Sequence, residues 1–179
     1  MKKALLIMLV LAVAIPVMAQ TDVGFKGIGG RIAYVDPESG WDPTIGIGVV
    51  TDLGTWIPQL HWDASLLFWS TGEDFGYADY TLRDIGLRSS VKYHFIEGPW
   101  EPYAGGGIGI HMFNFSYDYN NGYYIADYDD SDTEFGIQIL GGVEHQFNAQ
   151  WKGSAELEFD FEDVGETLLQ VNVIYMLGK

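Results

Sequence analysis

Hydrophobic and polar residues alternate one by one through Glu134–Phe161, on both sides of a short Asn-Ala-Gln turn. Phe135 and Ile137 share one parity in the first run, and Leu157 and Phe159 share one parity in the second. A repeat of two residues is typical of a β-strand whose faces meet different surroundings. The hairpin alone does not say which face meets water, because a soluble sandwich hides its apolar face whereas a membrane barrel exposes it to lipid.

The same alternation predicts eight strands, with connections that are alternately short and long. The strands are expected at residues 23–35, 44–51, 56–69, 79–95, 100–117, 134–147, 151–161 and 166–177. The short connections, 52–55, 96–99 and 148–150, all fall on one side, and the longest connection, 118–133, falls on the other. Short periplasmic turns, longer outer loops and an even strand count are typical of outer-membrane barrels. The predicted fold class is all-β, an eight-stranded antiparallel up-and-down transmembrane β-barrel.

Sorting the predicted strands by parity separates an apolar surface from a charged surface. The apolar surface, expected to face lipid, contains Ile45, Ile47, Val49, Leu60, Trp62, Leu66, Ile85, Leu87, Val91, Ile108, Ile110, Leu169, Val171 and Val173. The charged surface contains Arg31, Asp63, Asp84, Arg88, Lys92, Glu144, Lys152, Glu156, Glu158 and Asp160. Because charges at mid-membrane are costly, we expect this second set to form an ion-paired network in the lumen. Side chains fill the lumen of an eight-stranded barrel, which predicts a largely plugged interior.

Tryptophans stand at the ends of several predicted strands. Trp56, Trp100 and Trp151 each open a strand after a short turn, and Trp69 ends the third strand. Aromatic side chains are enriched where a membrane meets water, because one part of the ring system contacts hydrocarbon while another part is hydrated. We therefore expect these four residues to belong to interface girdles, with Trp69 in the outer girdle.

The N-terminus has a charged head, residues 1–3, an apolar run, residues 4–17, and small residues before a cleavage position after Ala19. This pattern predicts a signal peptide over 1–19 and a barrel domain over 20–179. The formal net charge is -16, and without the two basic residues of the leader seven basic residues remain against 25 acidic ones. Such an acidic balance argues against a nucleic-acid partner. The chain has no cysteine, so we expect no disulfide framework.

An acidic segment lies in the longest predicted connection. It carries Asp127, Asp129, Asp130 and Asp132 without any Lys or Arg between residues 118 and 134. Carboxylate oxygens are ligands for divalent cations such as Ca²⁺, which makes these four residues a candidate weak cation site. The spacing does not match the Ca²⁺-loop template, because Gly and the bidentate Glu are missing from their positions. A solvated outer loop is the alternative interpretation.

Four histidines, His61, His94, His111 and His145, stand apart in the sequence. None has the H-x-x-x-H or H-E-x-x-H spacing that indicates zinc, and we expect the first three to form hydrogen bonds in the lumen. No serine stands in a G-x-S-x-G turn. The sequence therefore predicts no catalytic residue, no metal and no cofactor.

Two segments resemble a known family. Residues 100–110, WEPYAGGGIGI, are similar to a Pro-Tyr plus glycine-rich strand of the small outer-membrane β-barrel family, which includes the transmembrane domain of the major outer-membrane protein of Gram-negative bacteria. Residues 141–159 resemble the penultimate hairpin of that family. The resemblance implies the cell outer membrane as location, with outer-membrane lipid, lipopolysaccharide and the barrel-assembly machinery as partners. The ending Tyr175–Lys179 departs from the aromatic last residue that family members commonly carry.

These observations predict an integral outer-membrane protein with a structural or surface-interaction role and an unidentified surface partner. A narrow pore for ions or small solutes is the first alternative, and it requires a continuous water path past Arg88, Lys92 and Glu156. A soluble exported barrel of lipocalin type is the second alternative. That alternative predicts an apolar lumen.

Overall fold

The computed structural model describes residues 21–178 except residues 39, 121–124 and 163. The predicted signal peptide lies outside the described residues. Eight antiparallel strands close into a barrel in which each strand pairs with its neighbours in the chain and β1 pairs with β8. The strands are β1 (Asp22–Pro37), β2 (Thr44–Ile57), β3 (Leu60–Asp74), β4 (Ala78–His94), β5 (Trp100–Asn120), β6 (Ile125–Gln146), β7 (Trp151–Phe161) and β8 (Glu166–Met176). The predicted fold class is confirmed.

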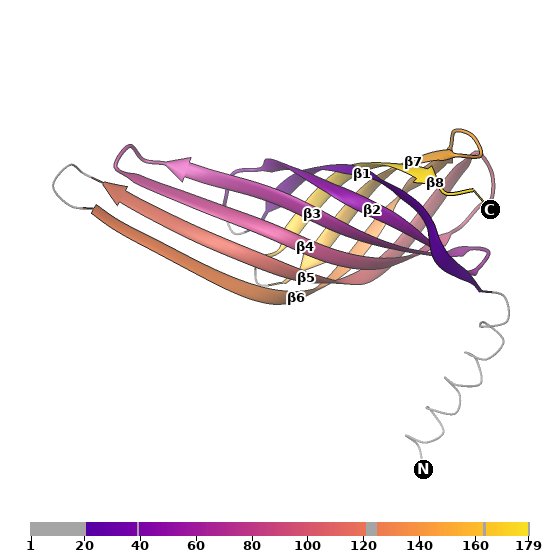
Figure 1. Cartoon of the computed structure of the whole chain (residues 1–179), viewed down its shortest axis with the longest axis horizontal. Helices are drawn as coiled ribbons and strands as arrows, with labels where there is room; N and C mark the ends of the chain where they lie inside the picture. Colours follow the sequence, from indigo (N-terminus) through magenta and orange to yellow (C-terminus); the bar gives the residue numbers. More distant parts are fainter. Residues whose placement is uncertain (1–20, 39, 121–124, 163, 179) are drawn as a thin grey trace, which may run out of the picture.

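The barrel wall is much taller on one side than on the other. β5 and β6 contain 21 and 22 residues, whereas β7 and β8 contain 11 each. In Figure 1 the ends of β3, β4, β5 and β6 project together beyond the rest of the barrel, and the start of β1 and the C-terminus lie at the opposite end. The short turns lie at that opposite end too. We call the two ends of the barrel the projecting end and the short-turn end.

The projecting strands form an open four-stranded sheet. β6 pairs with β7 only from Ile137 toward its C-terminal end, so residues 125–136 have β5 as their one partner strand among the described residues. The last six residues of β3 likewise lie beyond its pairing with β2, which ends at the Ile47–Phe68 pair. The projecting sheet therefore has two edges, one on β3 and one on β6.

The first short turn lies further along the chain than the sequence predicts. Residues 52–55 are part of β2, and the turn is formed by Pro58 and Gln59. The pairing of β2 with β3 shifts register between Asp52 and Thr55, where Gly54 adopts a φ of 85° and donates its N–H to Asp52 Oδ1 at 2.7 Å. The prediction was wrong because a β-bulge with a glycine at positive φ resembles a tight turn in the sequence. Trp56 consequently lies near the end of β2.

The long outer connections are also mostly strand. Residues 118–120 and 125–133, predicted as loop, continue β5 and β6, which pair without a register shift from Trp100–His145 to Asn120–Ile125. The predicted loop at 70–77 is similarly shortened, because β3 reaches Asp74 and β4 begins at Ala78. These predictions were wrong because the polar composition was interpreted as loop. A paired strand surrounded by water on its outer face tolerates polar residues at every second position.

The outside of the barrel is apolar and its inside is charged. Ile47, Phe135 and Leu169 are 62%, 62% and 59% exposed, whereas Arg88 and Glu156 are each 1% exposed. This arrangement is the reverse of a soluble lipocalin-like barrel, whose lumen would be apolar. The described part of the chain contains no helix long and apolar enough to cross a membrane.

We predict that replacing an apolar residue in the middle of the wall with a charged one destabilises the barrel in lipid. Val171 is the central residue of β8 and is 56% exposed, so Val171→Arg should lower the free energy of unfolding in bilayers by about 2–4 kcal/mol. Ile96→Arg, in a short turn and outside the strands, should change it by about 0–1 kcal/mol. Urea titrations in lipid vesicles measure both values, and equal effects at the two positions would contradict a lipid-facing Val171.

Candidate functional site

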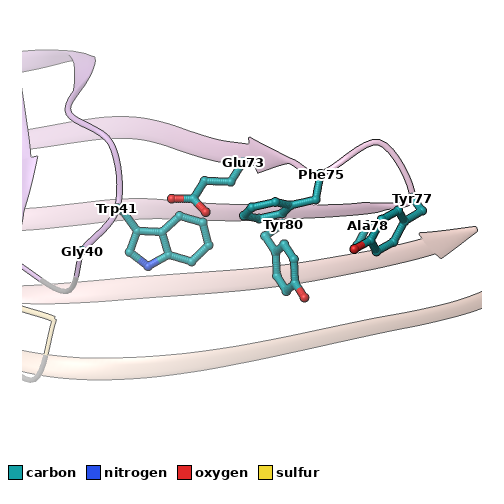
Figure 2. A pocket seen from close by; sticks show the side chains of 7 residues that line it. All are labelled: Gly40, Trp41, Glu73, Phe75, Tyr77, Ala78 and Tyr80. Atoms are coloured by element: carbon teal, nitrogen blue, oxygen red, sulfur yellow. The ribbon is translucent and has the colours of Figure 1, made fainter.

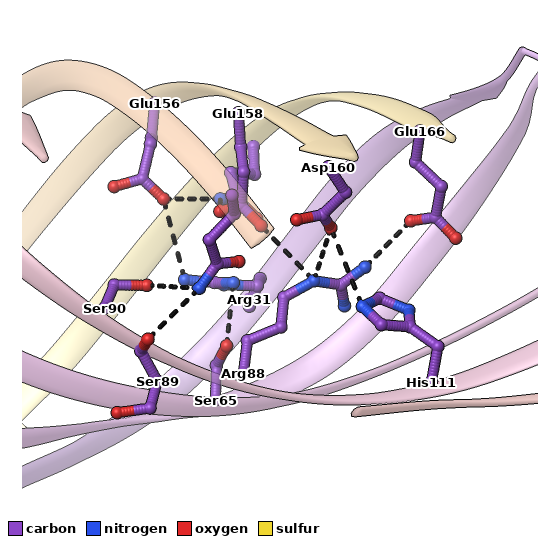
Figure 3. A network of polar contacts seen from close by, with 12 residues as sticks. Arg31, Ser65, Arg88, Ser89, Ser90, His111, Glu156, Glu158, Asp160 and Glu166 are labelled. Carbon is purple, nitrogen blue, oxygen red and sulfur yellow. Dashed lines mark hydrogen bonds and ion pairs between the residues drawn. The ribbon is translucent and has the colours of Figure 1, made fainter. Parts of the chain in front are cut away.

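The lumen contains stacked layers of ion pairs, which we call the lumen network. Arg88 of β4 is the centre of the layer nearest the projecting end, and its side chain is completely buried. Its Nε lies 2.9 Å from Asp160 Oδ2 and 3.3 Å from Glu158 Oε1, and its Nη2 donates to Glu166 Oε2 at 2.8 Å. Figure 3 shows the guanidinium held among these three carboxylates from β7 and β8.

The middle layer joins two cations to two carboxylates. Lys92 Nζ lies 2.6 Å from Asp63 Oδ2 and 2.7 Å from Glu156 Oε2. Arg31 Nη2 lies 3.7 Å from Glu156 Oε1, and Tyr103 donates its hydroxyl to Glu156 Oε2 at 2.8 Å. Gln170 of β8 also donates to Glu156 Oε1. Glu156 is therefore surrounded by donors from four other strands, which compensate the loss of its hydration on burial.

The layer nearest the short-turn end is built on Lys152, the second residue of β7. Its Nζ lies 2.6 Å from Asp52 Oδ2 and 3.0 Å from Glu144 Oε2. The β2 bulge positions Asp52 here, because the register shift that follows it lets the carboxylate bind both Gly54 N–H and the lysine. Next to this layer His94 Nδ1 lies 3.0 Å from Glu101 Oε2.

The structure places all ten residues of the predicted charge network inside the barrel. Nine of them, all except Asp84, are in the ion pairs described above, and Asp84 contacts His111. Asp52, Glu162 and Glu166 were not predicted as members of the network, and no charged partner was predicted for His111. Asp52 was assigned to a turn, and Glu166 is recognisable only by its inward parity with Leu168 and Gln170.

His111 of β5 lies in a cluster of carboxylates beside Arg88. Its Nδ1 lies 3.0 Å from Asp84 Oδ2, and its Nε2 lies 3.1 Å from Glu162 Oε2 and 3.9 Å from Asp160 Oδ2. Neither Nε2 nor the two oxygens of Glu162 form a hydrogen bond with any described residue. Burial, and then the charges of Glu166 and Asp160, raise the pKa of Glu162 to about 9.

The tryptophans divide into two groups. Trp56, Trp100 and Trp151 are 39%, 61% and 42% exposed, and the structure places them around the short-turn end. Trp69 is fully buried in the lumen, where its Nε1 donates to Glu166 Oε1 at 2.9 Å. Its assignment to an outer girdle was wrong, because Trp69 shares the inward parity of Leu67 and not the outward parity of Phe68.

The four aspartates of the candidate outer cation site lie in β6. Side chains of consecutive strand residues point to opposite faces, so Asp127 and Asp129 share one face while Asp130 and Asp132 share the other. The structure therefore does not bring the four carboxylates together. Their place along the β6 edge gives each of them access to water.

An aromatic pocket of about 500 Å³ lies on the inner face of the projecting sheet. Figure 2 shows Trp41 from the β1–β2 connection facing Glu73 of β3, with Phe75 and Tyr80 beside them. The rings of Phe75 and Tyr80 meet edge to face, with centroids 5.8 Å apart. The aromatic surface continues along the sheet, because Tyr80 pairs with Tyr117 of β5 and Tyr117 pairs with Tyr128 of β6.

Solved structures of several outer-membrane proteins share this fold. Neisserial surface protein A has 16% sequence identity and a TM-score of 0.59, over 86% of this chain and 96% of that chain. A major outer membrane protein from Thermus thermophilus has 13% identity and a TM-score of 0.59, over 84% of this chain and 99% of that chain. Ail, the attachment invasion locus protein of Yersinia pestis, has 14% identity and a TM-score of 0.55, over 86% and 97%. At these identities the likeness shows the fold alone.

No curated protein sequence matches the chain. A family model described as the outer membrane protein beta-barrel domain matches residues 5–176, which covers nearly the whole chain and all eight strands. The apolar exterior and the charged lumen of this barrel are consistent with that family. The chain therefore belongs to the outer membrane protein β-barrel domain family and is an integral protein of the Gram-negative outer membrane.

Proposed function

We propose that this protein is a closed barrel with a structural and surface-contact role, and that it is not a channel. The observation that carries the proposal is the lumen network. A conducting pore needs water along its whole length, and here each layer joins side chains from different strands across the lumen. The proposal includes no catalytic activity.

Two further features support closure. Toward the projecting end, an apolar cluster lies next to the Arg88 layer, and its members are Ala33, Val35, Leu67, Trp69, Leu82, Phe113 and Leu168. Toward the short-turn end, a cavity among Asp63, Lys92 and Lys152 has a volume of only about 10 Å³. A cavity of that size holds about one water molecule, so it supplies no continuous aqueous path.

The surface-contact role rests on the projecting sheet. Its inner face carries the aromatic pocket and the row Tyr80, Tyr117 and Tyr128, whereas its β6 edge carries carboxylates. Exposed aromatic surfaces rimmed by polar groups are typical of interaction sites. The acidic rim favours a partner whose contact surface is neutral or basic.

We also propose that residues 1–19 are a cleaved signal peptide and that 20–179 form the mature barrel. The charged head, the apolar run and the small residues before Gln20 support this division. Outer-membrane lipid, lipopolysaccharide and the barrel-assembly machinery are its proposed partners during insertion and in the membrane.

We predict that the purified protein forms no steady channels in planar bilayers. The ion-paired layers and the apolar cluster leave no water path, so currents should stay at the baseline of a protein-free bilayer. Glu156→Gln removes a charge from the middle layer without shortening the side chain, and it should also leave the current at baseline. Steady unitary currents in the wild type that change with Glu156→Gln would favour the narrow pore instead.

We predict that Arg88 contributes strongly to the stability of the barrel through its ion pairs in the lumen network. Arg88→Met keeps the length of the side chain but leaves three buried carboxylates without their partner, so it should cost about 3–5 kcal/mol of unfolding free energy. Arg83→Met on the exposed face of the same strand is the matched control and should cost about 0–1 kcal/mol. Chemical unfolding monitored by heat-modifiable gel migration compares the two. Similar losses of unfolding free energy in both variants would contradict a stabilising role of Arg88 in the lumen.

A further inference from the structure

Carboxyl groups outnumber cationic side chains at one level of the lumen. The middle layer balances Arg31 and Lys92 against Asp63 and Glu156. Around the Arg88 layer, by contrast, five carboxyl groups surround one guanidinium and one imidazole: Glu158, Asp160 and Glu166 contact Arg88, and Asp84 and Glu162 contact His111. A buried excess of one charge is unfavourable unless protons or a bound cation compensate it.

His111 has the carboxylate partner that a metal-binding histidine usually has. A carboxylate only accepts, so Nδ1 donates to Asp84 Oδ2 at 3.0 Å, and in the neutral imidazole the lone pair is then on Nε2, which lies 3.1 Å from Glu162 Oε2 and 3.9 Å from Asp160 Oδ2. A carboxylate that accepts from the far nitrogen of the imidazole, and so fixes the tautomer and the ring, is the usual partner of a histidine ligand. The Nε2 is fully buried and forms no hydrogen bond with a described residue.

The ligand atoms are already close together. His111, Asp160 and Glu162 each offer one atom, and these atoms all lie within 4.8 Å of one another. One imidazole nitrogen and two carboxylate oxygens suit a cation of the Zn²⁺ class, whereas Ca²⁺ and Mg²⁺ prefer oxygen ligands alone. We propose that His111, Asp160 and Glu162 bind a divalent transition-metal cation, with Zn²⁺ as the representative, and that Asp84 is the positioning residue of His111.

The backbone around the cluster leaves space for these side chains. Gly136 of β6 faces the cluster, and a Cβ at that position would lie 2.5 Å from Glu162 Oε2. A Cβ at Gly109 would lie 2.6 Å from His111 Nε2. The cluster also lies beside a cavity of about 490 Å³, which borders Asp160 and Glu162 and is lined further by Glu38 and Glu134. Its carboxylates favour the approach of cations.

The test uses the full-length mature protein, folded in detergent micelles without lipopolysaccharide. Zn²⁺ is titrated in competition with a chromophoric chelator, and Co²⁺ binding is followed by its visible absorption, which reports the ligand geometry. We expect one saturable site per chain that prefers Zn²⁺ over Ca²⁺ and Mg²⁺. His111→Ala should abolish it, Glu162→Gln and Gly136→Ala should weaken it at least about tenfold, and Asp84→Asn should weaken it about 10–100-fold.

The matched control is His145→Ala, which removes a histidine at the short-turn end and should leave zinc affinity unchanged. Heat-modifiable migration verifies that each variant is folded, and if His111→Ala does not fold, Glu162→Gln and Gly136→Ala decide the outcome. Absence of saturable Zn²⁺ binding overturns the proposal. So does binding that persists in both of those variants, or binding that is lost in His61→Ala, because His61, His94 and Glu144 form another group of closely spaced ligand atoms.

Discussion

Hydrocarbon on the outside of the wall is the constraint on which the rest of the structure depends. Lipid offers no hydrogen bonds, so every backbone group within the membrane must pair with another strand, and closure of β1 on β8 completes that pairing. The same medium excludes ionised side chains from the outer face. Arg88, Lys92 and Glu156 therefore point inward, where each has a partner of opposite charge.

Because the charges are confined to a narrow lumen, their positions along the barrel are set by the two-residue spacing of the inward-facing side chains on each strand. Glu156, Glu158 and Asp160 occupy alternate positions along β7. Glu156 meets Arg31 and Lys92 in the middle layer, and Glu158 and Asp160 both meet Arg88 in the next layer. Two lysines and two arginines are too few for all the carboxylates that point inward. The excess of carboxyl groups is greatest around His111. That level therefore differs chemically from the middle layer, where cations and carboxylates are balanced.

The fold and most of the lumen could be predicted from the sequence because alternation of residue type records directly which face meets lipid. Features that do not alter the alternation could not be predicted in this way. The bulge at Gly54 has the local signature of a turn, and only the pairing of β2 with β3 reveals it. Trp69 was assigned to the outer girdle because of its residue type, although its parity along β3 indicates the lumen. The proximity of His111 to Glu162 could not be predicted because these residues belong to segments that are distant in sequence.

The open edges of the projecting sheet have a consequence for how copies of the protein behave toward one another. An unpaired strand edge presents a row of N–H and C=O groups that readily accepts a further strand, and such edges promote aggregation. Residues 125–136 of β6 have β5 as their one partner strand in the described part of the chain, and Asp127, Asp129, Asp130 and Asp132 lie along this edge. Two such edges brought side by side repel each other electrostatically. The acidic residues thus let the strands extend past the lipid without recruiting neighbouring molecules into a continuous sheet.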